Sequence, residues 1–176
     1  MMFDDFRMPC PTIGLTIAPI MIAVAGCSPA GAAGEPAVAP VAQEESARHP
    51  ISGLEIAEVT VISGDKRIPF NTEFALSRQA QGRGLMFRES LGDDEAMIFP
   101  NDPPATRSFW MKNTPISLDI IFIGVDRRIA NIETAVPYSL ESVLSDGEVI
   151  AVFEIRGGLA AELGIAPGDQ VLWEMP

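Results

Sequence analysis

The chain has 176 residues and a formal net charge of −12 at pH 7. Such an acidic surface repels phosphate backbones and anionic lipid head groups, so the composition argues against a nucleic-acid-binding protein. The two cysteines, Cys10 and Cys27, both lie near the N-terminus, so the remainder of the chain has no thiol for a disulfide or for metal binding.

The first 27 residues have the features of a lipoprotein signal peptide. An apolar run begins near Ile13 and ends in the lipobox Val24-Ala25-Gly26-Cys27. The run is shorter than the roughly 20 apolar residues that a transmembrane helix needs, and small residues before the cysteine suit a signal peptidase. We therefore expect residues 1–27 to direct export and Cys27 to become the lipidated N-terminus. The alternatives are an ordinary secretory signal, or one transmembrane helix, that happens to end in cysteine.

The residues after Cys27 predict the location of the protein and a tether. Aspartate directly after the lipidated cysteine favours inner-membrane retention in many Gram-negative bacteria, so Ser28 predicts the periplasmic face of the outer membrane. Residues 28–52 are rich in Ala, Pro, Gly and Glu and hold few large apolar side chains, so we expect a disordered tether. His49, the single histidine, lies in this stretch and is expected to be solvated.

Residues 53–176 are expected to form one β-rich domain with a single core. Apolar residues alternate with polar ones along residues 68–76, which is the pattern of a half-buried strand. Further strands are predicted at 55–62, 96–99, 106–112, 117–123, 129–135, 149–155 and 170–174. Many short strands separated by Gly, Pro, Asn and Asp turns predict a mainly β fold, a small antiparallel β-sandwich or barrel-like domain.

Two short helices are predicted between these strands. Ser77 can cap a turn or two that continues to Gln81 and ends at Gly82. The second helix spans Leu159–Leu163 and ends at Gly164, after which Ile165 can pack back on it.

Several sequence blocks of the domain form a recognisable set. They are Gly84-Leu85-Met86-Phe87-Arg88, the sequence FWMKNT at residues 109–114 followed by Ile116, Leu118-Asp119-Ile120-Ile121-Phe122-Ile123, Val152-Phe153-Glu154-Ile155, Gly164-Ile165 and Gly168-Asp169. Together these blocks resemble the uncharacterised DUF192 family. The resemblance extends over residues 54–174 and implies a small single domain of the sandwich or barrel kind. It implies no function, because the family is named for lacking one.

The same blocks contain the candidate binding residues. Alternation places Trp110 and Lys112 on one face of a predicted strand. Together with nearby residues they offer cations, an amide and an aromatic wall, which suit a small polar or anionic ligand such as a carboxylate or a sugar. The candidates are Arg83, Met86, Arg88, Trp110, Lys112, Asn113 and Asp119. In the structural alternative, Lys112 or Arg88 pairs with Asp119, Trp110 fills the core, and Asn113 makes the turn before Pro115.

Two classes of function remain open. No zinc, phosphate-loop or CxxC motif is present, and the four methionines of the mature chain are scattered, so neither a metal nor a cofactor is expected. The first hypothesis is a monomeric, non-enzymatic lipoprotein that binds a small ligand or acts as an accessory module. The second is a periplasmic enzyme in which Lys112, desolvated beside Trp110, works with Asp119 as a base or imine former. An open cleft without an anion close to Lys112 would favour the enzyme; we favour the first hypothesis.

Overall fold

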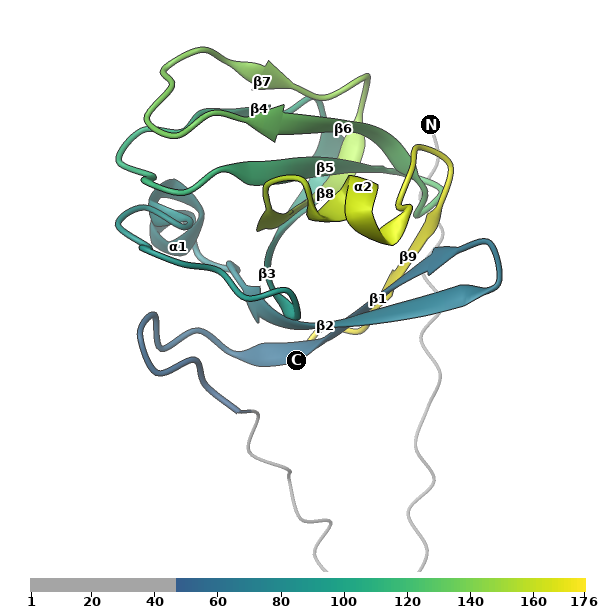
Figure 1. The fold of residues 1–176 in the computed structure, drawn as a ribbon, viewed down its shortest axis with the longest axis horizontal. Coiled ribbons are helices and arrows are strands. Elements are labelled where there is room, and N and C mark those ends of the chain that lie inside the picture. Colours follow the sequence, from purple (N-terminus) through teal and green to yellow (C-terminus); the bar gives the residue numbers. More distant parts are fainter. Residues whose placement is uncertain (1–46) are drawn as a thin grey trace, which may run out of the picture. The chain divides into compact units, whose positions relative to one another are not determined.

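A computed structural model describes residues 47–176 of the chain (Figure 1). The predicted signal peptide, the predicted lipidation site Cys27 and most of the predicted tether lie outside these described residues. Within residues 47–176, neither helix has the length and hydrophobicity that crossing a bilayer requires.

The described residues form strands and two short helices. In chain order they are β1 (Ile56–Ser63), β2 (Lys66–Phe74), α1 (Arg78–Arg83), β3 (Glu95–Ala105), β4 (Ser108–Phe109), β5 (Leu118–Gly124), β6 (Ile129–Ala135), β7 (Val143–Leu144), β8 (Val149–Arg156), α2 (Leu159–Leu163) and β9 (Gln170–Trp173). The prediction of a mainly β domain with two short helices is confirmed.

Seven of the strands form one strongly curved sheet in the order β6-β5-β8-β3-β2-β1-β9, and β4 pairs with β7 in a separate small sheet (Figure 1). The large sheet is mixed, because β2 and β3 run parallel while the other pairs are antiparallel. A parallel pair needs a crossover connection, and residues 75–94 supply it and carry α1. A single bridge between Arg128 and Gln170 brings β9 to the start of β6, but the sheet is not closed into a barrel.

Several predicted elements have different bounds in the structure: the strand predicted at 96–99 extends over Glu95–Ala105, and two more elements differ beside the candidate binding residues. The strand predicted at 106–112 shrinks to Ser108–Phe109, because the chain turns at Asn113, whose φ is 57°. The first helix does not end at Gly82 but continues to Arg83. Gly84 caps it with a φ of 49° and an N–H bond to the Ala80 carbonyl, and glycine tolerates such positive φ values.

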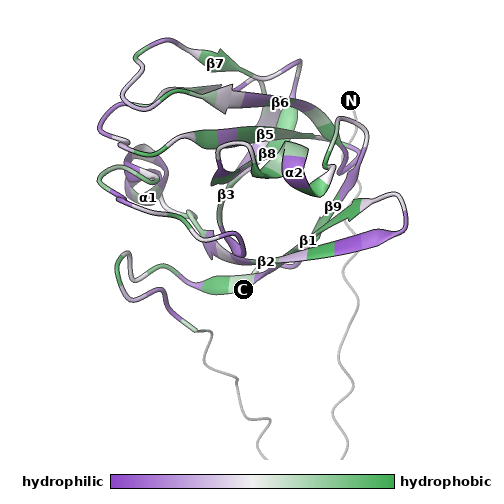
Figure 2. Ribbon diagram, in the orientation of Figure 1, coloured by the Kyte–Doolittle hydropathy of each residue, from purple (hydrophilic) through white to green (hydrophobic). Residues whose placement is uncertain are grey.

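Buried side chains form two apolar clusters, one on each face of the large sheet. Ile121 and Ile123 of β5 belong to the first cluster, whereas Leu118, Ile120 and Phe122 belong to the second. A strand buried on both faces is expected to be apolar along most of its length, and Figure 2 shows hydrophobic residues over most of β5 and β8. Two acidic residues interrupt this pattern: Asp119 on β5 and Glu154 on β8.

Candidate functional site

Three loops meet at one end of the domain, on the left in Figure 1. They follow α1, β4 and β6, and backbone hydrogen bonds join them. The Phe87 N–H donates to the Asn113 carbonyl over 2.8 Å, and the Tyr138 N–H donates to the Thr114 carbonyl over 3.1 Å. The three loops therefore form one connected surface.

This surface contains unusual backbone conformations. Phe87, Asn113 and Tyr138 have φ values of 65°, 57° and 62°, and within residues 47–176 Arg127 is the one other non-glycine residue with positive φ. Such angles are sterically costly for bulky side chains and cluster at functional sites. The Phe87, Tyr138 and Trp110 side chains are also more than half exposed. Two strained aromatic residues and an exposed tryptophan at one place make this surface a candidate for binding.

A pocket of about 220 Å³ opens beside these loops, and we call it the Glu154 pocket. Glu154 lies on the central strand β8, opposite Met97 of β3 and Ile120 of β5. Two arginines, Arg83 from the end of α1 and Arg107 before β4, also line the pocket. The pocket thus combines an acid, two cations and an apolar interior.

The Glu154 carboxyl is buried without a hydrogen-bond or ion-pair partner among residues 47–176. The residue is 5% exposed, and burial raises the pKa of the Glu154 carboxyl to about 8 because the apolar surroundings disfavour the charged form. Every fully enclosed side-chain nitrogen or oxygen of residues 47–176 has a hydrogen-bond partner. The carboxyl oxygens of Glu154 have none, so they must reach the open space of the pocket.

The two arginines of this pocket are free of carboxylate partners. None of the five ion pairs formed by the described residues includes Arg83 or Arg107. Arg107 makes long contacts of 3.5 Å to the Asn101 and Gln81 side-chain oxygens, and its guanidinium lies 5.7 Å from the centre of the Phe109 ring. Their positive charge is available to a ligand.

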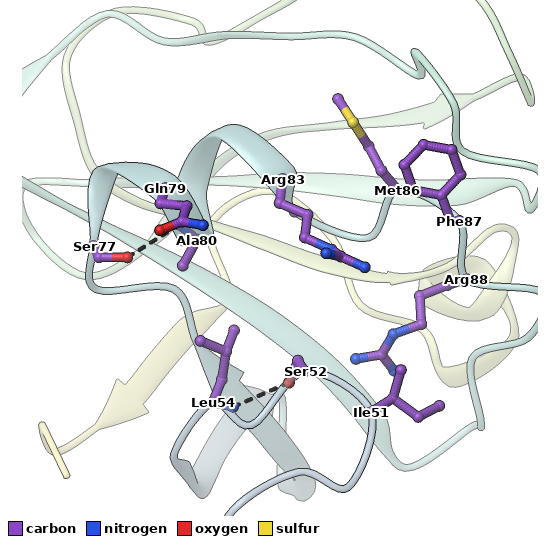
Figure 3. A pocket seen from close by; sticks show the side chains of 11 residues that line it. Ile51, Ser52, Leu54, Ser77, Gln79, Ala80, Arg83, Met86, Phe87 and Arg88 are labelled. Atoms are coloured by element: carbon purple, nitrogen blue, oxygen red, sulfur yellow. Dashed lines mark hydrogen bonds between the residues drawn. The ribbon is translucent and has the colours of Figure 1, made fainter.

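A second pocket of about 320 Å³, the Arg88 pocket, shares Arg83 and Met86 with the first. Figure 3 shows Arg83 and Arg88 pointing toward one another, with Ile51 close to Arg88. Arg88 is already occupied, because its Nη2 atom lies 2.6 and 2.8 Å from the two carboxylate oxygens of buried Glu73. This pocket therefore offers less free charge than the Glu154 pocket.

His49 belongs to the same ion-pair cluster. Its Nδ1 lies 3.2 Å from Arg88 Nη2 and 3.7 Å from Glu73 Oε2, and its side chain is 12% exposed. Ser52 also hydrogen-bonds to Glu73. The expectation that His49 is solvated is wrong, because these contacts fasten the residues just before β1 to the domain.

Trp110 and Lys112 lie at the surface. Trp110 is 51% exposed and lines the Glu154 pocket, so the alternative in which it fills the core is wrong. The Lys112 ammonium stands 5.2 Å from the centre of the Trp110 ring, in a cation–π contact, and does not line either pocket. Asn113 makes the turn before Pro115, with its amide 3.9 Å from the Met86 sulfur.

Asp119 has a structural role. Its carboxylate accepts hydrogen bonds from the Gly158 N–H and the Ala160 N–H, both over 2.9 Å, and from the Thr134 hydroxyl over 2.7 Å. These bonds hold the start of α2 against the sheet. The predicted pairing of Asp119 with Lys112 or Arg88 is therefore wrong, and the structure does not bring Lys112 and Asp119 together.

Sequence analysis missed the residues that the structure makes most conspicuous, Glu154 and Arg107. One signal was present: Glu154 is the single charged residue of the apolar segment 149–155. A lone acid in a strand buried on both faces must be either paired or functional. Residues 47–176 contain no group of His, Cys, Asp and Glu that could hold a metal ion.

Comparisons with known proteins agree with the sequence resemblance. The sequence profile of the DUF192 family, described as an uncharacterised conserved region, matches residues 59–173. No curated protein matches. A crystal structure of a protein of unknown function from Novosphingobium aromaticivorans is 53% identical, with a TM-score of 0.71, over 73% of this chain and 92% of the other. A putative transcription regulator from Sinorhizobium meliloti is 31% identical, with a TM-score of 0.65, over 68% of this chain and 94% of the other.

Proposed function

The chain belongs to the DUF192 family, and we propose that it is a non-enzymatic module that binds a small ligand in the Glu154 pocket, carried on an envelope lipoprotein. One observation carries this proposal: the buried Glu154 carboxyl faces the pocket and has no partner in the described part of the chain. With an apolar residue at this position the chain would fold at a lower cost in free energy, since a polar group that is buried without a hydrogen-bond partner in the protein loses most of its hydration. A residue that opposes stability is best explained by a ligand.

The enzyme hypothesis based on Lys112 and Asp119 has less support. The Asp119 carboxylate is used by three hydrogen bonds, and the Lys112 side chain is exposed on the face of Trp110. A catalytic lysine needs a desolvated environment to lower its pKa, and an exposed position does not supply one.

The cellular location in this proposal rests on the lipobox. The protein would be anchored by the lipid on Cys27 at the periplasmic face of the outer membrane, as a monomer that binds no nucleic acid and needs no cofactor. Labelling of cells with a fatty-acid analogue tests the anchor: the wild-type chain should be labelled, and Cys27→Ser should not. An unlabelled wild-type chain would contradict the lipoprotein assignment.

A thermal-shift screen tests the ligand-binding function. The full chain, purified in detergent, is heated with pools of small metabolites, and a ligand at 100 times its Kd should stabilise the folded state by about 2.7 kcal/mol. The shift should disappear in Arg107→Gln and persist in Glu148→Gln, a charge change at an exposed position outside both pockets. If no pool shifts the wild-type melting temperature, the proposed function is wrong.

A further inference from the structure

The charges that line the Glu154 pocket define what it can accept. Arg83, Arg107 and Glu154 are the charged side chains among its lining residues. The other elements packed around Glu154 contribute apolar groups: Met97 from β3 and Ile120 from β5 are its cross-strand neighbours. With a neutral Glu154 the pocket is cationic and attracts an anion, whereas with an ionised Glu154 the carboxylate repels an anion.

The pocket is also small and partly aromatic. Its volume of about 220 Å³ lies below the roughly 300–1,000 Å³ of pockets for drug-sized ligands, so its ligand is small. Phe99, Phe109 and Trp110 line it, and the Phe99 and Phe109 rings meet edge to face with centroids 5.1 Å apart. These walls fit the flat or apolar body of an organic molecule, and the polar groups fit its head.

We infer that the Glu154 pocket binds a small organic monocarboxylate, whose carboxylate is held by the guanidinium groups of Arg83 and Arg107 and accepts a hydrogen bond from the protonated carboxyl of Glu154. This inference rests on the proposed ligand-binding function. Guanidinium groups match the planar carboxylate, and an O–H···O⁻ hydrogen bond between an acid and a carboxylate is short and strong. A neutral acid in an apolar site is the one form of glutamate that can donate such a bond.

Proton coupling follows from this arrangement. Burial raises the pKa of Glu154 to about 8, so the donor form dominates at neutral pH. Above that pKa, each further pH unit lowers the fraction of protonated Glu154 about tenfold. The apparent Kd of a monocarboxylate should therefore be constant from pH 6 to 7 and rise about tenfold per pH unit above 8.

The experiment titrates the full chain in detergent with three probes and their neutral analogues. The probes are acetate, lactate and benzoate, and the analogues are acetamide, lactamide and benzamide. Binding is followed by NMR of the isotope-labelled protein at pH 6, 7, 8 and 9. At least one acid should bind at pH 7 more than tenfold tighter than its amide and lose affinity above pH 8, while amide binding should not change with pH.

Variants then assign the groups. Glu154→Gln keeps a neutral donor, so it should still bind the acid but without the loss above pH 8, whereas Glu154→Met should bind at least tenfold more weakly. Arg83→Gln and Arg107→Gln should each weaken acid binding at least tenfold with little effect on the amide. Glu148→Gln is the matched control and should titrate as wild type does. The melting temperature of each variant verifies that it is folded.

The outcomes separate this inference from the proposed function. If the metabolite pools yield a ligand but the three acids do not bind, or bind no tighter than their amides, the monocarboxylate inference is wrong and the binding function stands. Acid binding that tightens as the pH rises from 7 to 9 would also overturn it. If neither pools nor probes bind the wild-type chain, both fail.

Discussion

Two buried carboxyl groups lie side by side on the central strands and have opposite environments. Asp119 of β5 is in register with Ile155, and Glu154 of β8 is in register with Ile120. The two acids therefore point to opposite faces of the sheet. Asp119 receives three hydrogen bonds, whereas Glu154 receives none from the described residues and faces a pocket. The comparison shows that burial alone does not define the role of a carboxyl group. Asp119 is structural because it has hydrogen-bond partners, whereas Glu154 has none among the described residues and is available to a ligand.

The largest loss of stability is expected for Asp119, the structural member of this pair. Asp119→Ala leaves two backbone N–H groups and the Thr134 hydroxyl without their acceptor. We expect a loss of about 3–5 kcal/mol in the free energy of unfolding, because several buried donors lose bonds to a charged group. Urea melts measure it, with Asp65→Ala in an exposed turn as the control. A loss below about 1 kcal/mol would mean that Asp119 does not hold α2.

The next prediction concerns Glu154 and the pH dependence of the free energy of unfolding. The pKa of Glu154 is raised from 4.5 to about 8, so between these values the folded chain keeps a proton that the unfolded chain has lost. The free energy of unfolding should thus fall as the pH rises through this window, by about 1.4 kcal/mol per pH unit from this group. Glu154→Gln should remove this slope and be more stable than wild type at pH 8, with little difference at pH 4.5.

Urea melts of both proteins at pH 5, 6, 7 and 8 measure the slope. The difference between wild type and Glu154→Gln isolates Glu154 from the other titrating groups, which both chains share. Equal slopes would show that Glu154 has an ordinary pKa in the folded chain.

A smaller effect is expected for Trp110 at the wall of the pocket than for Phe99 in its interior. Phe99 is 1% exposed, so Phe99→Ala should cost about 3–5 kcal/mol. Trp110 is 51% exposed, so Trp110→Ala should cost about 1 kcal/mol or less while weakening ligand binding. Thermal and denaturant melts of the two variants measure the contrast. A loss for Trp110→Ala as large as that for Phe99→Ala would return Trp110 to the core.

The smallest effect concerns the strained loops. Phe87 has a φ of 65° and is 66% exposed, so Phe87→Gly relieves strain while giving the unfolded chain more freedom. These terms oppose each other, and we expect a net change within about 1 kcal/mol. Phe74→Gly, at a buried position of β2 without such strain, should be far more destabilising in the same melts. Comparable losses of stability in the two variants would show that the Phe87 side chain contributes to packing within the domain and is not a free contact surface for a partner.

Local patterns in the sequence determined much of the fold. The bounds of β6 and α2 agree with the residues predicted, and those of β1, β2, β5 and β8 agree within two residues. Alternation, apolar runs, a serine cap and glycine stops act within a few residues, so they can be recognised without the rest of the chain. The same local patterns gave Trp110 as part of the candidate surface, but with a strand around it that is not formed.

Tertiary structure alone decided which charged groups meet. Arg88 pairs with Glu73 from a strand that precedes it by 15 positions, and Asp119 binds Gly158, which lies 39 positions away. Distances along the chain of this size are set by the order of strands in the sheet, which local patterns do not encode. The apolar segment around Glu154 was evident from the sequence by itself, but only the folded sheet shows which face the carboxyl is on, that it has no partner there, and that two arginines stand at its pocket.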